Sequence, residues 1–160
     1  MQLIVAAVGR LKQGPERELA AHYAARIDAA GPGVSLGPMS VIELAEGRGA
    51  TADLRKSDEA LRLIAALAKT ETVVALDETG KAQTSRQFAE FIRTQRDGGC
   101  SRLAFVIGGP DGQGQPLRQR AARALSLGPM TLPHGLARLI VLEQIYRAVT
   151  ILSGHPYHRD

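Results

Sequence analysis

The residue types that could carry chemistry gather in the last third of the sequence, between residues 103 and 160. Glu143 and Arg147 lie four positions apart with the acid first, which is the favourable orientation for an ion pair along one helix face. On an otherwise apolar helix they are either a satisfied buried pair or residues of a site or an interface. The chain then ends in the segment HPYHRD at 155–160, with no local partner predicted for it. Such a tail is either a frayed end or part of a site, and its polar aromatic groups favour the site.

A glycine-rich loop follows an apolar run in this region, with glycine at 108, 109, 112 and 114. It is not a phosphate-binding P-loop, because Gln115 and Pro116 stand where lysine and serine or threonine would be required. It is not a dinucleotide fingerprint either, because Leu117 occupies the place of the third glycine. The loop is therefore either an ordinary turn between a strand and a helix or a place where the backbone approaches a ligand closely.

A second loop, LGPMTLP at residues 127–133, has apolar side chains, main-chain donors and acceptors and no titratable side chain. Such a lining suits a neutral aromatic heterocycle such as adenine, recognised by backbone groups in an apolar slot. It suits a triphosphate poorly. The histidines of the tail lack carboxylate or thiol companions at metal-binding spacing, so no metal site is predicted.

Length, composition and charge set the broad class of the protein. The chain has 160 residues, 44% of them hydrophobic, which is enough for one domain, residues 1–160, with its own core. No apolar run is long enough to cross a bilayer and the start lacks the basic residues of a signal peptide, so a soluble cytoplasmic protein is predicted. The single cysteine, Cys100, excludes an internal disulfide. A net charge of +4 is compatible with a phosphate-rich partner, whereas 4% aromatic residues are too few for a base-stacking surface.

Short apolar runs alternate with amphipathic segments along the whole chain. Strands are predicted at residues 3–8, 34–44, 72–76 and 103–107 and near 129–132, and helices at about 15–30, 51–68, 84–96, 115–124 and 135–153. This alternation predicts an α/β domain with a mostly parallel sheet flanked by helices. A turn-like cluster at residues 77–81 follows the third strand, at the edge where parallel sheets bind ligands.

The last helix is apolar around most of its circumference, which a surface helix would not be. Either the monomer encloses it, or one face packs on the sheet and the other on a second subunit. In a domain of this size the second arrangement is favoured, so a homodimer is predicted.

The sequence resembles the RlmH-type ribosomal RNA large subunit methyltransferases, small members of the SPOUT class, over its whole length. The resemblance rests on several motifs in the same order: VALD at 74–77 with GK at 80–81, FVIGGPDG at 105–112, LSL at 125–127, MTLPH at 130–134, EQIYRA at 143–148 and HPYHR at 155–159. Asp111 stands where the family more often has glutamate, Gly135 stands where a proline often follows the histidine, and Gln113 with Gly114 makes the glycine loop polar and looser. These departures would make the loop around a cofactor more flexible without removing a group needed for binding.

For the fold, the resemblance implies a SPOUT-type sheet whose carboxyl-terminal part is threaded into a trefoil knot. It implies S-adenosyl-L-methionine as the cofactor, bound in a bent shape by the knot loops. The residues placed around the cofactor are Leu76, Gly108, Gly109, Leu127, Gly128, Pro129, Met130, Thr131 and Leu132. The resemblance also implies a homodimer whose subunits complete one another's sites, in agreement with the apolar last helix.

For the activity, the resemblance implies methylation of N3 of a pseudouridine in 23S rRNA on the assembled ribosome. No metal is needed, because the methyl group of a sulfonium is already activated, and catalysis reduces to positioning and removal of the N3 proton. The candidate catalytic residues are His134, Glu143, Arg147, Tyr157, His158 and Arg159. We hypothesise that His134, His158 or Glu143 assists the proton. Arg147 and Arg159 would hold phosphate or the uracil-like carbonyls.

Two alternatives stay open at this point. One is a related SPOUT methyltransferase that acts on tRNA, and the other is a non-catalytic ribosome-binding factor that has kept the fold. With a net charge of +4 and no added RNA-binding domain, the chain is expected to bind isolated RNA weakly and to depend on a shaped ribosomal surface.

Overall fold

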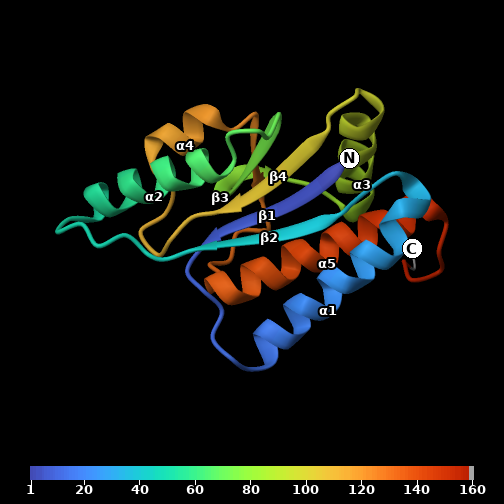
Figure 1. Ribbon diagram of the computed structural model, residues 1–160, viewed down its shortest axis with the longest axis horizontal. Helices are drawn as coiled ribbons and strands as arrows, with labels where there is room; N and C mark the ends of the chain where they lie inside the picture. The colour runs from blue at the N-terminus through green and yellow to red at the C-terminus, as the bar shows by residue number, and fades with distance from the viewer. Residues whose placement is uncertain (159–160) are drawn as a thin grey trace.

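The computed structural model describes residues 1–158 and contains a five-stranded sheet in which every strand pairing is parallel. The strand order is β2-β1-β4-β3-β5 (Figure 1). Along the chain the elements are β1 (Gln2–Val8), α1 (Pro15–Ala30), the 3-10 helix η1 (Gly31–Val34), β2 (Met39–Leu44), α2 (Ala52–Ala66), β3 (Thr72–Ala82), α3 (Ser85–Asp97), β4 (Arg102–Ile107), α4 (Gln115–Arg120), β5 (Arg123–Ser126) and α5 (His134–Ser153). The predicted α/β class with a parallel sheet flanked by helices is confirmed.

Helices cover both faces of the sheet, which is why β1 and β4 are apolar on both sides. The core on one face is built with α1, α3 and α5, and the core on the other with α2 and α4 (Figure 1). Successive residues of β1 alternate between them, with Leu3 in the first core and Ile4 in the second. Since both faces are covered, the carboxyl ends of the strands are the part of the sheet left for a ligand.

Two predicted elements in the carboxyl-terminal third are wrong. The last strand is β5 rather than a strand near residues 129–132, and α4 ends at Arg120 rather than near residue 124. The amide of Ala122 donates to the carbonyl of Val73 at 2.8 Å, so sheet pairing begins where the helix was expected to continue. Pro129 and Pro133 bracket the predicted strand and lack the amide hydrogen that a ladder needs, which leaves residues 127–133 as a loop.

The second strand also begins later than predicted, at Met39 instead of residue 34. The first part of the expected run is taken up by η1 and by Pro38, which cannot donate a ladder hydrogen bond. The amide of Met39 instead donates to the Asp28 carboxylate at 2.6 Å, so α1 anchors the point where the strand starts.

The third strand runs past the predicted turn at residues 77–81 and reaches Ala82, but its register against β5 shifts between Leu76 and Lys81. Within this interruption Asp77 accepts hydrogen bonds from the amide and the hydroxyl of Thr79, at 2.9 and 2.6 Å. The predicted turn is therefore present as a local side-chain turn inside a longer strand.

The same interruption brings two distant segments into close contact. A β-carbon on Gly80 would come within 2.7 Å of the backbone of Ala124 and Leu125. Only glycine allows the two backbones to pass so closely. This tight crossing is compatible with a knotted path, and the trefoil knot itself stays a prediction.

The last helix, α5, packs mostly within a single chain, although Leu136 is 42% exposed and Ile140, Ile151 and Leu152 are partly exposed. It lies against the sheet with α1 and α3 beside it (Figure 1). Leu142, Ile145 and Val149 have no exposed surface. The monomer therefore explains most of the apolar circumference of α5 and leaves Leu136 and part of Ile140 uncovered. The homodimer stays a prediction.

Arg138, near the amino-terminal end of α5, is a fully buried arginine that the apolar pattern of this helix did not predict. Arg138 is 1% exposed, pairs with Glu43 and donates to the carbonyl of Gly9 at 2.7 Å. We expect Arg138→Met to lower the free energy of unfolding by about 3 kcal/mol, because it leaves the Glu43 carboxylate without its cation. Urea denaturation measures this, and adding Glu43→Leu should recover part of the loss. An unchanged midpoint in Arg138→Met would contradict the assignment.

Candidate active site

A cavity of about 400 Å³ opens at the carboxyl ends of three neighbouring strands. Leu76 of β3, Ile107 of β4 and Leu125 of β5 line it, and the loops after β4 and β5 complete the wall. This volume lies within the usual range of small-molecule sites, and the position is the one where open parallel sheets bind ligands.

The cavity gathers nearly all the residues that the sequence placed around a cofactor. The exception is Pro129, which is exposed and does not line the cavity. The chain turns at the preceding residue, Gly128, whose φ of 123° favours glycine. The predicted residues that do line the cavity are Leu76, Gly108, Gly109, Leu127, Gly128, Met130, Thr131 and Leu132. Two loops that are separate in sequence thus form one site.

Gln113, which was expected to loosen the glycine loop, instead links β3 at its interruption to the end of β4. Its side-chain amide donates to the carbonyl of Leu76 at 2.6 Å and to that of Val106 at 3.4 Å. Gln113 is buried, and a β-carbon on Gly108 would come within 2.9 Å of its side chain and 3.0 Å of the Gly112 carbonyl. A larger residue at position 108 must therefore displace the loop that forms the cavity wall.

Part of the wall is charged. Hydrogen bonds from Thr79, together with the nearby guanidinium of Arg118, hold the pKa of Asp77 below its usual value. A hydrogen bond from Arg55 does the same for the pKa of Asp111. Both carboxylates are therefore anionic at neutral pH. The charged residues lining the cavity are Asp77, Glu78, Asp111 and Arg118, an excess of negative charge that suits a ligand with positive centres.

These charged residues were absent from the predicted cofactor set. The signal for Asp77 was its place after an apolar strand, which marked the right edge of the sheet without naming the side chain. Arg118 gave no signal, because the sequence does not show which face of the short helix α4 points toward the cavity.

Among the predicted catalytic residues that the structure describes, only His134 lines this cavity. It is the first residue of α5 and also lines a second cavity, of about 520 Å³, beside the loop between β1 and α1. Glu143 and Arg147 lie further along the same helix, at about 13 and 20 Å from His134 along its axis for a rise of ~1.5 Å per residue. Arg159 lies outside the described residues.

Glu143, Arg147 and Tyr157 instead form a separate cluster on the carboxyl-terminal half of α5. Arg147 donates to Glu143 Oε1 from Nε at 3.0 Å and from Nη2 at 2.7 Å, which confirms the predicted intrahelical pair. The Tyr157 hydroxyl donates to the same oxygen at 3.3 Å. Its ring packs edge-on against Tyr146 with the centroids 4.8 Å apart. The expectation that the tail has no local partner is therefore wrong, since Tyr157 docks on its own helix.

His158 follows Tyr157 in this docked tail and is half-buried. Its Nδ1 atom is buried and has no hydrogen-bond partner among the described residues. Within one chain neither His158 nor Tyr157 lines the cavity at the strand ends. The structure thus places His134 at the cavity and the other described catalytic candidates from the middle of α5 onward.

The docked tail should respond to strongly alkaline pH. Burial, hydrogen bonding with Tyr23 and the negative charge of Glu143 raise the pKa of Tyr157 to about 12. Because the folded pKa is above the unfolded value of about 10, the stability of docking is complete below pH ~10 and is lost as pH rises toward 12. Tyrosinate absorbance should show one tyrosine ionising near pH 12, and Tyr157→Phe should lack this component. Complete ionisation of all tyrosines near pH 10 in the folded protein would contradict the docking.

Residues 1–158 hold neither a metal-binding group of side chains nor a helix that could span a membrane. No group of three or more His, Cys, Asp or Glu side chains in this range is arranged to hold a metal ion. No helix in the described part of the chain is long and apolar enough to cross a membrane.

Comparison with known proteins gives matches along the whole described chain. The family model for the predicted SPOUT methyltransferases matches residues 1–158. A protein of Brucella anthropi named ribosomal RNA large subunit methyltransferase H is 50% identical over 160 residues, covering 100% of both chains. A protein of Rhizobium meliloti with the same name is 52% identical over 159 residues, covering 99% of both chains.

Two solved structures share the fold. A probable methylase family protein from Haemophilus influenzae has a TM-score of 0.54 at 11% identity, covering 99% of this chain and 70% of that one. A putative methylase family protein from Neisseria gonorrhoeae has a TM-score of 0.52 at 14% identity, covering 91% of this chain and 81% of that one. At such low identities this likeness concerns the fold alone.

Proposed function

Since the chain belongs to the ribosomal RNA large subunit methyltransferase H family of SPOUT methyltransferases, we propose that it transfers the methyl group of S-adenosylmethionine to N3 of a pseudouridine in 23S rRNA on the assembled ribosome. The family resemblance read from the motifs is confirmed by these matches. The substrate position and the action on assembled ribosomes, in the cytoplasm, are parts of the proposal.

The observation that carries the proposal is the cavity at the strand ends, which joins the two predicted loops. Its apolar, backbone-rich side, formed by Leu127, Gly128 and Leu132, suits the adenine ring. Its acidic side, with Asp77 and Glu78, suits the ammonium and sulfonium groups of the cofactor. The volume of about 400 Å³ is adequate for a ligand of this size.

The chemistry asks little of the protein beyond positioning and one proton transfer. S-adenosylmethionine supplies a methyl group that is already activated for in-line attack. The target nitrogen must lose its proton, and a positioned histidine side chain is a common proton acceptor in catalysis. His134 is the candidate best placed within one chain, because it lines both the cofactor cavity and the neighbouring cavity beside residues 9–16. We assign the target base to that neighbouring side.

The distance between the two ends of α5 supports a homodimer with shared sites. Tyr157 docks beside Glu143 and Arg147, and Arg147 is about 20 Å along the helix from His134. The tail of one subunit therefore does not serve the cavity of the same subunit in this conformation. In the proposed dimer the tail of one subunit lies at the cavity of the other, where Arg147 and Arg159 contact phosphate or the uracil-like carbonyls.

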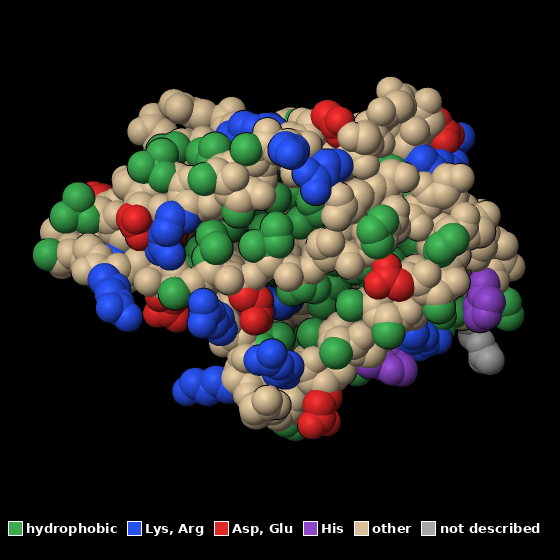
Figure 2. Space-filling view, viewed as in Figure 1, with side chains coloured by type: hydrophobic (Ala, Val, Ile, Leu, Met, Phe, Trp, Pro, Cys, Tyr) green, Lys and Arg blue, Asp and Glu red, His purple; other side chains and the backbone are tan. Residues whose placement is uncertain are grey.

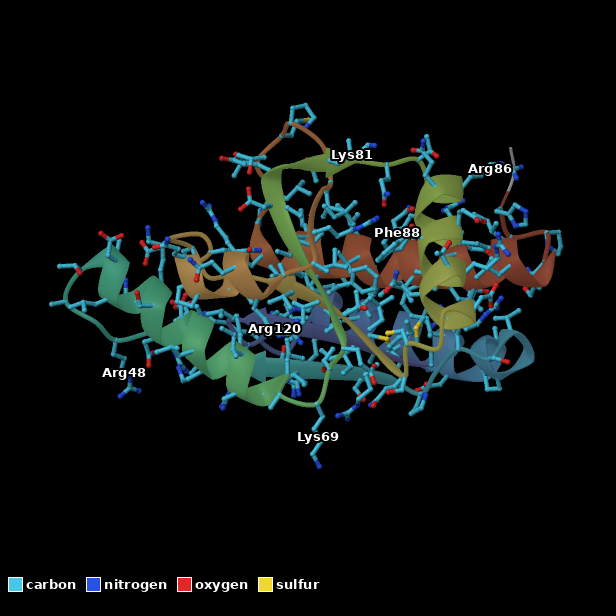
Figure 3. The ribbon with its side chains drawn as sticks, turned by 90° about the horizontal axis from the view of Figure 1, so that it is seen from above. Arg48, Lys69, Lys81, Arg86, Phe88 and Arg120 are labelled. Carbon is cyan, nitrogen blue, oxygen red and sulfur yellow. The ribbon has the colours of Figure 1, made fainter. Side chains whose placement is uncertain are left out.

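The surface charge supports docking on a shaped ribosome rather than on free RNA. On the face shown in Figure 2, basic and acidic side chains are interspersed. Arg48 and Lys69 point away from the molecule near opposite ends of α2 (Figure 3). The cations of α2 itself have acidic partners, in the pairs Arg55–Asp111, Lys56–Asp53 and Arg62–Asp58. Cations that are dispersed or neutralised bind the phosphate backbone of an isolated RNA weakly.

The test is incubation of the protein with labelled S-adenosylmethionine and, in parallel, intact ribosomes, free 23S rRNA or tRNA. Mass spectrometry of the digested RNA then identifies the methylated nucleoside. We expect label in 23S rRNA from ribosomes, on N3 of a pseudouridine. Labelled tRNA with unlabelled ribosomes would point to a tRNA methyltransferase, and cofactor binding without transfer to any RNA would point to a non-catalytic ribosome-binding factor.

A further inference from the structure

The cofactor loop, residues 108–114, is anchored from outside the cavity by the first half of α2. Arg55 on α2 pairs with Asp111 through two hydrogen bonds, Nε to Oδ2 at 2.7 Å and Nη2 to Oδ1 at 3.1 Å. This forked geometry fixes the carboxylate in both direction and plane. Asp111 lines the cavity and Arg55 does not. Arg55 can therefore affect a bound ligand only through Asp111 and the cofactor loop.

The same arginine also holds the connection in front of α2, residues 45–50. Its Nη1 atom donates to the carbonyl of Gly49 at 3.1 Å. One helical turn later, the buried carboxylate of Glu59 accepts the amide of Gly47 at 2.7 Å. A β-carbon on Gly47 would come within 3.0 Å of the backbone of Arg55, so the connection lies directly on the helix.

Glu59 touches the cofactor loop as well. A β-carbon on Gly109 would lie 2.5 Å from Glu59 Oε2, an atom that is buried and has no hydrogen-bond partner among the described residues. Further along the loop, a β-carbon on Gly114 would lie 2.5 Å from the carbonyl of Lys56. The cofactor loop thus rests on α2 at Gly109, Asp111 and Gly114, and α2 is the surface that sets its shape.

We propose that Arg55 is a positioning residue for the cofactor, holding the cofactor loop and residues 45–50 together on α2 so that the loop keeps its ligand-binding shape. This inference rests on the proposed binding of S-adenosylmethionine at the cavity. A loop that is already ordered loses less conformational entropy when the ligand binds. The contacts of Arg55 should therefore raise the affinity for the cofactor. The reacting groups at His134 lie on a different element and are not held by Arg55.

Replacing Arg55 by alanine in the full-length protein tests this. We expect calorimetry to show that Arg55→Ala binds S-adenosylmethionine on the order of tenfold more weakly, because a charge-assisted forked contact is lost. The kcat at saturating cofactor should change by less than about twofold, since the chemical step is untouched. Arg55→Lys keeps the charge without the fork and should fall between the two.

Arg62→Ala is the matched control. Arg62 lies about two turns further along α2, pairs with Asp58 and donates to the carbonyl of Ala45 at 2.9 Å, all without contacting the cofactor loop. It should bind the cofactor as the wild type does, with thermal melting of the ligand-free protein showing that both variants fold. In a double-mutant cycle, Arg55→Ala combined with Asp111→Ala should bind no more weakly than Asp111→Ala alone, because both changes remove one interaction.

The outcomes distinguish a failure of the positioning role of Arg55 from a failure of the proposed function. Unchanged affinity for S-adenosylmethionine in Arg55→Ala, or an equal loss in Arg62→Ala, would overturn the positioning role of Arg55. It would leave the methyltransferase proposal intact. Absence of affinity for S-adenosylmethionine in the wild-type protein would overturn both the proposed function and the positioning role of Arg55. If Arg55→Ala does not fold, Arg55→Lys decides the question by the same comparison.

Discussion

Deletion of residues 155–160 is expected to abolish methyl transfer and to leave cofactor binding almost unchanged. The docked part of the tail lies beside Glu143 and Arg147, in the middle and second half of α5, whereas the cofactor cavity is lined by His134 at the start of this helix. None of residues 155–158 lines the cofactor cavity, and in the proposed dimer the tail contacts the RNA at the partner's site, so the Kd for S-adenosylmethionine should stay within about twofold of wild type. The loss of a group that positions the RNA or moves its proton should lower kcat by roughly 10²- to 10⁴-fold. Calorimetry and label transfer to ribosomes measure the two effects.

The truncation needs a control for lost packing, because Tyr157 contacts both Tyr146 and Glu143. Tyr157→Phe keeps the ring against Tyr146 and removes only the hydroxyl. Thermal melting of both variants shows how far the carboxyl-terminal end of α5 depends on the tail. Lost cofactor affinity in the truncated protein, with an unchanged melting temperature, would contradict the assignment of the tail to the RNA side of the site.

The strands that were predicted well are those whose sequence is apolar on both faces. The runs at residues 3–8, 72–76 and 103–107 lie inside β1, β3 and β4, because a strand covered by helices on both sides leaves no room for polar residues. Prediction failed where a distant segment decides the structure. The end of α4 depends on the hydrogen bond from Ala122 to Val73, about fifty residues away, and the length of β3 depends on its crossing with Ala124 and Leu125.

The candidate site, like the fold, was predictable from the sequence only in part. Its backbone-lined walls were predictable, because glycine and proline loops that follow buried strands converge at one edge of a parallel sheet. Its charged wall was not, since the pair of Arg55 and Asp111 joins residues 56 positions apart. The identity of the cofactor came from the family resemblance and not from composition. The separation of His134 from Tyr157 along α5 required the three-dimensional structure.

A dimer with shared sites predicts that two inactive variants restore activity when they are combined. Gly108→Val removes the cofactor site, because the added side chain collides with Gln113 and Gly112. It leaves the tail intact. The protein truncated before residue 155 keeps its cavity but has no tail. In a mixed dimer, the cavity of the truncated subunit meets the tail of the Gly108→Val subunit, and one complete site is formed.

Random mixing of equal amounts makes about half of the dimers mixed, each with one working site, so roughly one quarter of the wild-type activity per subunit should return. Co-expression with two different affinity tags isolates the mixed dimers, whose activity should be about half that of wild type. Each variant alone, and a mixture of the two after chemical cross-linking of the separate homodimers, should stay inactive. If the tail acted on the cavity of its own subunit, neither subunit of a mixed dimer would hold a complete site. Mixed dimers that form and remain inactive would therefore overturn the shared-site arrangement.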